Sequence, residues 1–136
     1  MKELLQITKA LADENRLRIM MMVKEKEPCV CQIVEVLGTA PSTASKHLSI
    51  LRTAGLIDCY KDGRWIYYHL PRNPDRMVQD TFKYLFSNLE GSEIVHRDLL
   101  QINDICDLEP DCLTEQQRKK QLSSKIYSNA KRRQIK

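Results

Sequence analysis

The chain has 136 residues, of which 42% are hydrophobic and 29% charged, with a net charge of +4. This length fits one domain with a single core, and no stretch is apolar enough to cross a membrane. The first residues lack the charged-then-apolar layout of a secretion signal, so we expect a cytoplasmic protein.

The positive charge is concentrated toward the C-terminus. From residue 114 onward there are eight basic side chains and one acidic side chain, so this tail carries +7 and the rest of the chain −3. A body with this charge is not a general polyanion binder. Nucleic acid would have to bind a local basic surface, with nonspecific attraction from the tail.

Helical periodicity marks the first part of the chain. Residues 4–11 form one apolar stripe, and a second stripe follows Asp13, a residue suited to cap a helix N-terminus. Pro28 predicts the first turn of a third helix, because the N–H that proline lacks has no partner there. Gly38 predicts the C-terminal end of that helix.

A fourth helix and a hairpin follow. Pro41 opens the helix, which ends near Gly55. Residues 56–61 and 64–70 are strand-like, and Asp62-Gly63 between them predicts a two-residue hairpin turn.

Two further helical stripes cover about 75–89 and 94–105. Helices followed by a β-hairpin in this order, with short connections, predict a mainly α protein with a β-hairpin. The fold class that fits is a winged helix-turn-helix.

The helix after Pro41 has the surface of a DNA-reading helix. Small hydroxyl side chains near its N-terminus allow close approach in the major groove, and basic side chains on the helix and around the hairpin turn supply charge for phosphates. We therefore expect double-stranded DNA as a partner. The candidate contacts are Ser42, Thr43, Ser45, Lys46, His47, Arg52, Lys61 and Arg64.

Two other classes of function were weighed. Winged helices also serve as protein-interaction modules, and the fold alone does not fix the function. An enzyme is disfavoured, because the sequence has no nucleophile–base pair, acidic dyad or glycine-rich phosphate loop. We expect no catalytic residues.

Five cysteines, an odd number in a chain without an export signal, favour ligation or redox chemistry over disulfides. Cys29 and Cys31 lie near a helix N-terminus, which lowers the pKa of thiols. Thiolates prefer soft ions such as arsenite, antimonite, cadmium or lead. Residues two apart in a helix point about 200° away from each other. Binding one ion therefore requires an irregular first turn, and would remodel the start of this helix and disturb the next.

The other cysteines are less constrained. Cys106 and Cys112 lie past the last clear helix and could complete a three-sulfur site, form a second site or remain exposed thiols. Cys59 falls on the first strand, where a packed thiol is expected. Redox or persulfide sensing is a further alternative, which needs two cysteines to approach without a metal.

Four stretches carry a family resemblance: residues 11–19, Cys29-Val30-Cys31, residues 42–48 and residues 62–68. Together they resemble the ArsR/SmtB family of metal-responsive winged-helix repressors, over roughly residues 5–90. The first and third stretches are shared widely across that family. The Cys-Val-Cys element looks like the thiolate site of its arsenic and cadmium/lead sensors.

The resemblance implies a homodimer whose terminal helices form the two-fold interface. The metal-free protein would bind an operator near its own promoter. Arsenite or antimonite, or alternatively cadmium or lead, would release it, with no permanently bound cofactor. Arsenic sensors of this kind often carry a third cysteine three residues after the second, a position that is Val34 here. Similar repressors place inducer cysteines near the C-terminus, so the candidate ligands are Cys29, Cys31, Cys106 and Cys112.

These interpretations divide the chain in two. We expect residues 1–106 to form the DNA-binding and dimerisation domain. Residues 107–136 are then a cysteine-containing linker and a basic, flexible tail.

Overall fold

The computed structural model describes residues 1–106 and 117–119. The elements, in chain order, are α1 (Lys2–Leu11), α2 (Glu14–Glu25), α3 (Val30–Leu37), α4 (Pro41–Thr53), β1 (Asp58–Asp62), β2 (Trp65–His69), α5 (Arg76–Leu89) and α6 (Glu93–Cys106). This is the predicted mainly helical fold with a two-stranded hairpin, a winged helix-turn-helix. No helix in the described part of the chain is long and apolar enough to span a bilayer.

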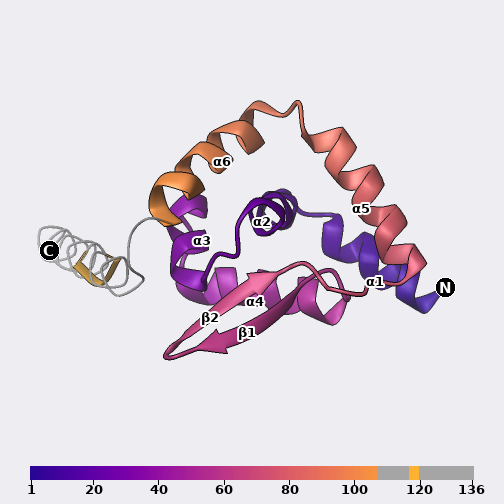
Figure 1. Ribbon diagram of the computed structural model, residues 1–136, viewed down its shortest axis with the longest axis horizontal. Coiled ribbons are helices and arrows are strands. Elements are labelled where there is room, and N and C mark those ends of the chain that lie inside the picture. The colour runs from indigo at the N-terminus through magenta and orange to yellow at the C-terminus, as the bar shows by residue number, and fades with distance from the viewer. Residues whose placement is uncertain (107–116, 120–136) are drawn as a thin grey trace, which may run out of the picture.

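Helix α2 is the centre of the core and is seen end-on in Figure 1, with the other helices around it. Five consecutive residues of α2, from Ile19 to Val23, are buried. A helix that is apolar on all sides must be surrounded, and α1, α3, α4 and α6 all pack against it. Asp13 caps this helix as predicted, because its side chain accepts a hydrogen bond from the N–H of Arg16 at 3.1 Å.

The start of α3 differs from the prediction. Pro28 is not in the first turn, because the helix begins at Val30 and Cys29 is its N-cap residue. The carbonyl of Pro28 instead accepts a hydrogen bond from the N–H of Tyr68 on β2, at 3.0 Å. The end of α3 is as predicted: Gly38 has a φ of 69°, a left-handed conformation that favours glycine.

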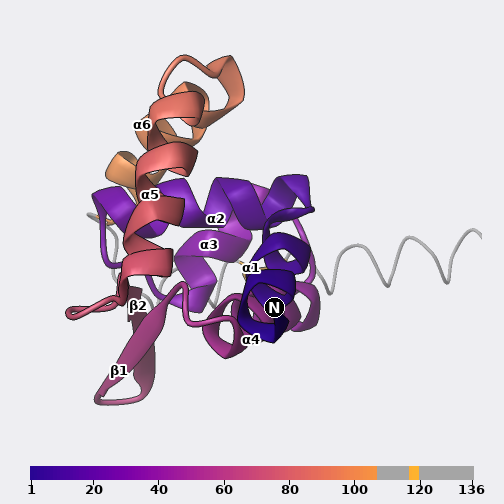
Figure 2. The same cartoon turned by 90° about the vertical axis from the view of Figure 1, so that its right-hand side faces the viewer.

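The wing is an antiparallel hairpin that projects away from the helices (Figure 2). Asp62 pairs with Trp65, so the two-residue loop is Gly63-Arg64 and the predicted turn was one residue too early. Gly63 has a φ of 62°, and this requirement places the glycine at the first loop position.

Helices α5 and α6 run from the wing back over the top of the molecule (Figure 1). Asp75 caps α5, accepting a hydrogen bond from the N–H of Val78 at 3.0 Å. Helix α6 packs against α2 and α3. It thereby brings the C-terminal part of the domain to the same end as the start of α3.

Candidate DNA interface and thiol site

Helix α4 buries one face and exposes the other. Ala44, Leu48 and Leu51 are buried in the core. The remaining side is solvent-exposed and carries most of the predicted DNA contacts: Ser42, Thr43, Ser45, Lys46 and Arg52. The structure therefore places these five side chains on an accessible helix surface next to the wing.

His47 lies apart from this surface. Its ring is half-buried, and Nδ1 lies 3.2 Å from Nη1 of Arg16. The same guanidinium donates from Nε to the carbonyl of Ala10 at 2.6 Å and from Nη2 to the carbonyl of Lys9 at 3.2 Å. Arg16 thus joins the last turn of α1, the first turn of α2 and the middle of α4, and His47 is part of that joint.

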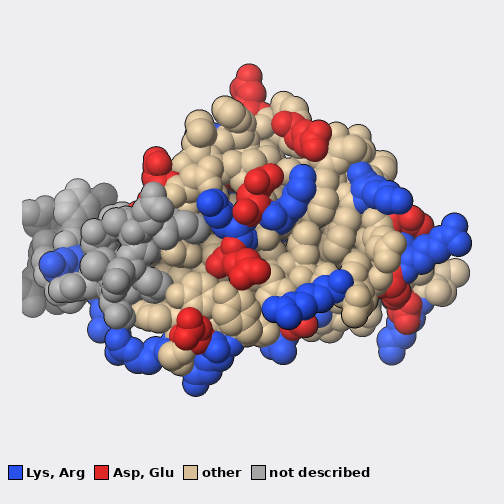
Figure 3. Space-filling view, in the orientation of Figure 1, with Lys and Arg blue, Asp and Glu red and all other residues tan. Residues whose placement is uncertain are grey.

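The two basic wing residues, Lys61 and Arg64, are both exposed near the hairpin turn. In Figure 3, Lys and Arg side chains line the lower edge of the molecule, where the wing and α4 lie, with acidic groups among them. The upper edge, around the turn between α5 and α6, carries acidic groups. The basic side chains on this face are therefore gathered near the wing and α4, although the chain before residue 114 carries a net charge of −3.

Cys29 and Cys31 are both buried at the N-terminus of α3, with Cys29 fully so. Cys29 is extended rather than helical, with φ −88° and ψ 170°. This conformation supplies the irregular first turn that a shared ligand requires. The two thiols lie close enough for each to shift the pKa of the other.

Gln32 fixes this arrangement through a capping box. Its side-chain Oε1 accepts a hydrogen bond from the N–H of Cys29 at 3.0 Å, while the sulfur of Cys29 accepts one from the N–H of Gln32. Gln32 is buried although it is polar, so this bond satisfies a group that water does not reach. Capping boxes normally use Ser or Thr, and here a thiol takes that place.

The electrostatics of the two thiols differ. A hydrogen bond from Cys31 to the sulfur of Cys29, together with N–H groups of the first turn of α3, lowers the pKa of Cys29 to about 7 despite its burial. The same hydrogen bond and burial raise the pKa of Cys31. Near neutral pH Cys29 is therefore partly ionised while Cys31 stays a thiol, and the helix N-terminus favours the negative charge.

The residues at and just before Cys29 are also hydrogen-bonded to the wing. Besides the bond between Pro28 and Tyr68, Cys29 pairs with Tyr67 in an antiparallel bridge. The hydroxyl of Tyr60 donates to Oε2 of Glu27 at 3.0 Å. The segment before α3 is therefore tied to β2 by an isolated bridge and to β1 by the Tyr60 bond, and this connection was not foreseen from the sequence.

The other cysteines fall in different places. Cys59 is half-buried on β1. Cys106 is the last residue of α6, but its side chain lies outside what the structure describes, as does the whole of Cys112. Within residues 1–106 and 117–119 there is no group of three or more His, Cys, Asp or Glu side chains arranged to hold a metal. Gln117 donates from Nε2 to the carbonyl of Cys31 at 2.8 Å.

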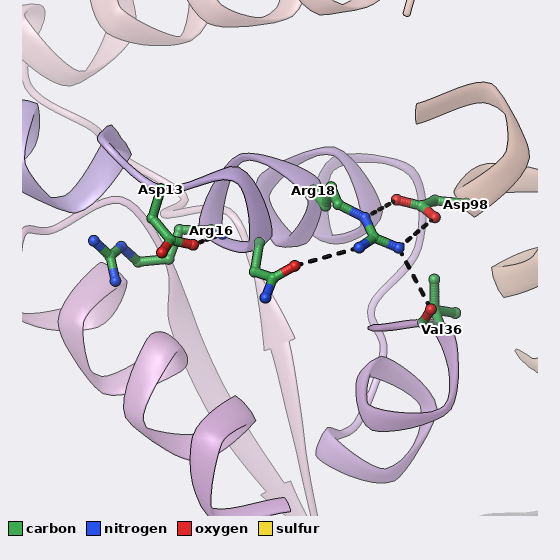
Figure 4. A network of polar contacts seen from close by, with 6 residues as sticks. Asp13, Arg16, Arg18, Val36 and Asp98 are labelled. Carbon is green, nitrogen blue, oxygen red and sulfur yellow. Dashed lines mark hydrogen bonds and ion pairs between the residues drawn. The ribbon is translucent and has the colours of Figure 1, made fainter. Parts of the chain in front are cut away.

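A buried ion pair holds α6 in place (Figure 4). Arg18 on α2 donates from Nε to Oδ2 of Asp98 at 2.6 Å and from Nη2 to Oδ1 at 2.9 Å. Nη2 also lies 3.5 Å from the carbonyl of Val36, near the end of α3. Asp98 was missed in the sequence, although an acidic residue on the apolar stripe of Val95, Ile102 and Ile105 was the signal for a buried partner.

Comparison with known proteins agrees with this architecture. Residues 13–58 match the model of the family described as bacterial regulatory protein, arsR family. The cadmium resistance transcriptional regulatory protein CadC of Listeria innocua is 43% identical over 63 residues, which are 46% of this chain and 53% of that protein. The chain thus matches about half the length of that relative.

Two further similar proteins are matched over a larger share of their own length. The arsenical resistance operon repressor of Escherichia coli K12 is 33% identical over 84 residues, which are 58% of this chain and 72% of that protein. The solution structure of a homodimeric winged helix-turn-helix DNA-binding domain from Mycobacterium bovis has a TM-score of 0.56 and 25% identity, over 68% of this chain and 82% of that one. The chain therefore belongs to the arsR family of bacterial regulatory proteins.

Proposed function

We propose that this protein is a homodimeric transcriptional repressor that leaves its operator when arsenite or antimonite binds the thiolates of Cys29 and Cys31. The observation that carries the proposal is the burial of both thiols at the start of α3, with Cys29 as its extended N-cap and Cys31 in its first turn. Helix α3 directly precedes α4. The arsenical resistance repressor of E. coli is the relative that supports this inducer. Free thiols persist in a reducing compartment, so the proposal includes a cytoplasmic location.

The chemistry suits the pair. Each arsenic–sulfur bond replaces one hydroxyl of arsenous acid and releases one water, so two bonds consume both thiols without an oxidant. Cys29 reacts first, because its lowered pKa gives it the larger thiolate fraction of the two near neutral pH. Cys31 then follows as its hydrogen bond to Cys29 is lost.

Inducer binding would cause release from DNA because Cys29 and Cys31 are linked to both α4 and the wing. Bonding of both sulfurs to one atom changes the capping box that Cys29 forms with Gln32, and with it the start of α3. At its other end α3 turns into α4 at Gly38. Pro28, next to Cys29, is bonded to Tyr68 of the wing. The inducer thus acts on α4 and on the wing, the two elements that carry the proposed DNA contacts.

A third sulfur is proposed from Cys106 or Cys112. Helix α6 ends with Cys106 and packs against α3. Gln117 contacts the carbonyl of Cys31. Cys112 lies five positions before Gln117, and five Cα–Cα steps reach at most about 18 Å. Cys59 is on the wing and serves as the matched control.

The DNA-facing residues are proposed to be Ser42, Thr43, Ser45, Lys46, Arg52, Lys61 and Arg64, with His47 acting through Arg16. The two-fold interface is proposed on α1 and α5. Leu4, Leu5 and Tyr84 are exposed on these helices, and the similar domain from M. bovis is a homodimer. Two copies of α4 would then reach successive major grooves.

The second candidate is a cadmium- or lead-responsive repressor, which the identity to CadC favours. One experiment separates the two. Reduced protein bound to its own upstream DNA is titrated with arsenite, antimonite, cadmium, lead and zinc, and the fraction of bound DNA is followed. Release by arsenite or antimonite at lower concentration than by cadmium or lead supports the first candidate, and the reverse order supports the second.

The variants Cys29→Ser and Cys31→Ser are expected to bind DNA and to ignore the inducer, while Cys59→Ser responds as the parent does. Either Cys106→Ser or Cys112→Ser should weaken the response. A normal response of both Cys29→Ser and Cys31→Ser, with loss in Cys106→Ser and Cys112→Ser, would place the site in the C-terminal region and contradict the proposal.

A further inference from the structure

A groove of about 370 Å³ lies between α4 and β2, open to solvent. Ser45, Ser49, Arg52 and Thr53 form its α4 wall, Tyr68 forms the β2 wall, and buried Leu48 lies beneath. The four α4 residues follow a helical spacing of four, three and one, so they share one face of the helix. Three of the lining residues, Ser49, Thr53 and Tyr68, were not among the DNA contacts predicted from the sequence.

The lining is rich in hydrogen-bond donors and positive in charge. Four of the six side chains carry a hydroxyl, Arg52 carries a guanidinium, and no carboxylate lines the groove. Within residues 1–106 and 117–119, Arg52 forms no ion pair. Its charge acts on the phenol of Tyr68, so the two groups face the same space.

The phenol of Tyr68 is available as a donor. Burial, and to a lesser extent Cys59, raises the pKa of Tyr68, while Arg52 opposes this shift. The hydroxyl therefore keeps its proton at neutral pH. A phosphodiester has only acceptor oxygens and one negative charge, so it matches a lining of donors around a guanidinium. A base edge, which also presents donors, matches this lining less well.

We propose that the groove between α4 and β2 binds one phosphate of the DNA backbone, with Arg52 supplying the charge and Ser45, Ser49, Thr53 and Tyr68 the hydrogen bonds. The proposal rests on the proposed DNA-binding function. One phosphate in this place is held by the recognition helix and the wing at once. Binding of this phosphate therefore depends on the position of α4 relative to the wing. A small shift between these two elements weakens the contact.

The test is a scan of the operator with neutral methylphosphonate replacing one phosphate at a time. In the parent protein, replacement at one position per half-site is expected to weaken binding. Arg52→Ala and Tyr68→Phe should already bind more weakly, by about 3- to 10-fold, and should lose little more at that position. Arg97→Ala, at an exposed position of α6 outside the proposed interface, is the matched control and should lose affinity there as the parent does.

Two further readings complete the test. The slope of log affinity against log salt should fall by about 1 in Arg52→Ala and stay unchanged in Tyr68→Phe, which removes only a neutral hydroxyl. Inorganic phosphate alone is titrated against the parent by NMR. Millimolar binding at Tyr68 without any methylphosphonate-sensitive position would assign the groove to a free anion and overturn the proposal.

The outcomes separate this proposal from the function. If the parent binds operator and both variants show the parent's full pattern of sensitive phosphates, the groove is not a phosphate site, although the repressor function stands. Failure of the parent to bind its upstream DNA at any salt concentration contradicts the function, and with it this proposal. Tyr68→Phe keeps the ring and the main-chain bond to Pro28, so it tests the hydroxyl without unfolding the wing.

Discussion

The guanidinium of Arg18 donates two hydrogen bonds to the carboxylate of Asp98, a residue 80 positions further along the chain. Asp98 is only 1% exposed. The pair fixes α6 to α2, and the contact of Arg18 with the carbonyl of Val36 extends the link to the end of α3. The side chain of Arg18 therefore contacts both α6, which ends at Cys106, and α3, which begins at the two thiols.

Asp98→Ala should destabilise the fold by about 3 kcal/mol, because it leaves the charge of Arg18 buried without its partner. The double variant Arg18→Met/Asp98→Leu should recover most of this loss, since neither charge is then buried. Urea unfolding measures both. Glu90→Ala, which breaks the exposed 4.0 Å pair with Lys24, is the control and should change the free energy of unfolding by less than about 1 kcal/mol.

Lys46 and His47 are neighbours on α4 but should behave differently. Lys46→Ala is expected to weaken DNA binding and to lower its salt dependence by about one charge, because the proposed function assigns this exposed ammonium to phosphates. His47→Ala should instead lower the free energy of unfolding by about 1 kcal/mol through loss of its contact with Arg16. A normal salt slope in Lys46→Ala would count against this assignment of the DNA face.

Stability should rise with pH around neutrality because of Cys29. Its pKa is lowered from an ordinary value near 9 to about 7 in the folded protein, so the unfolded chain holds more protons between these values. The contribution is fully present above pH 9 and is lost as the pH falls through 7. Urea unfolding under reducing conditions at pH 6.5, 7.5 and 8.5 should show a rise of about 2 kcal/mol in the parent relative to Cys29→Ser.

The raised pKa of Cys31 works in the opposite sense, but only above the ordinary value near 9, where the unfolded chain would lose a proton that the folded chain keeps. The chosen pH range therefore isolates Cys29. Parallel pH profiles for the parent and Cys29→Ser would show that this thiol is not ionised in the folded state.

The assembly is tested on α1. Leu5 is 49% exposed there, and Leu5→Glu should convert the dimer to a monomer at micromolar concentration, because a charge replaces apolar contact area. DNA binding should weaken as well, since one half-site is then read alone. Sedimentation equilibrium measures the mass. Leu100→Glu, at 57% exposure on α6, is the matched control and should leave the dimer intact.

Local signals predicted most of the fold. Asp13 as a cap, Gly38 as a helix end and the hairpin after α4 all depend on neighbours within a few residues, and each was confirmed. The prediction that Pro28 lies in the first turn of α3 was wrong for a physical reason. The carbonyl of Pro28 accepts a hydrogen bond from Tyr68, a partner 40 residues away that no helical pattern reveals. The spacing from Cys29 to Gln32 was the local clue to the true start of α3, because it is that of a capping box.

The candidate site was predicted in part. The exposed polar face of α4 follows from its apolar face, since the two alternate with the helical period. The closeness of the thiols of Cys29 and Cys31 could not be deduced, because it depends on the extended conformation of Cys29. The bonds of residues 27–29 to the wing and of Gln117 to Cys31 join distant segments, and the sequence carries no periodic signal for them.

Cys29 occupies a position for which serine is the better residue. A hydroxyl caps a helix more strongly than a thiol, and the conformation of Cys29 is one that Ser adopts readily. Cys29→Ser keeps the cap and the bridge to β2 and removes the thiol that the proposed function assigns to the inducer. The chain thus keeps a weaker helix cap than serine would provide, and on the proposed function serine at this position would give a repressor that no longer responds to its inducer.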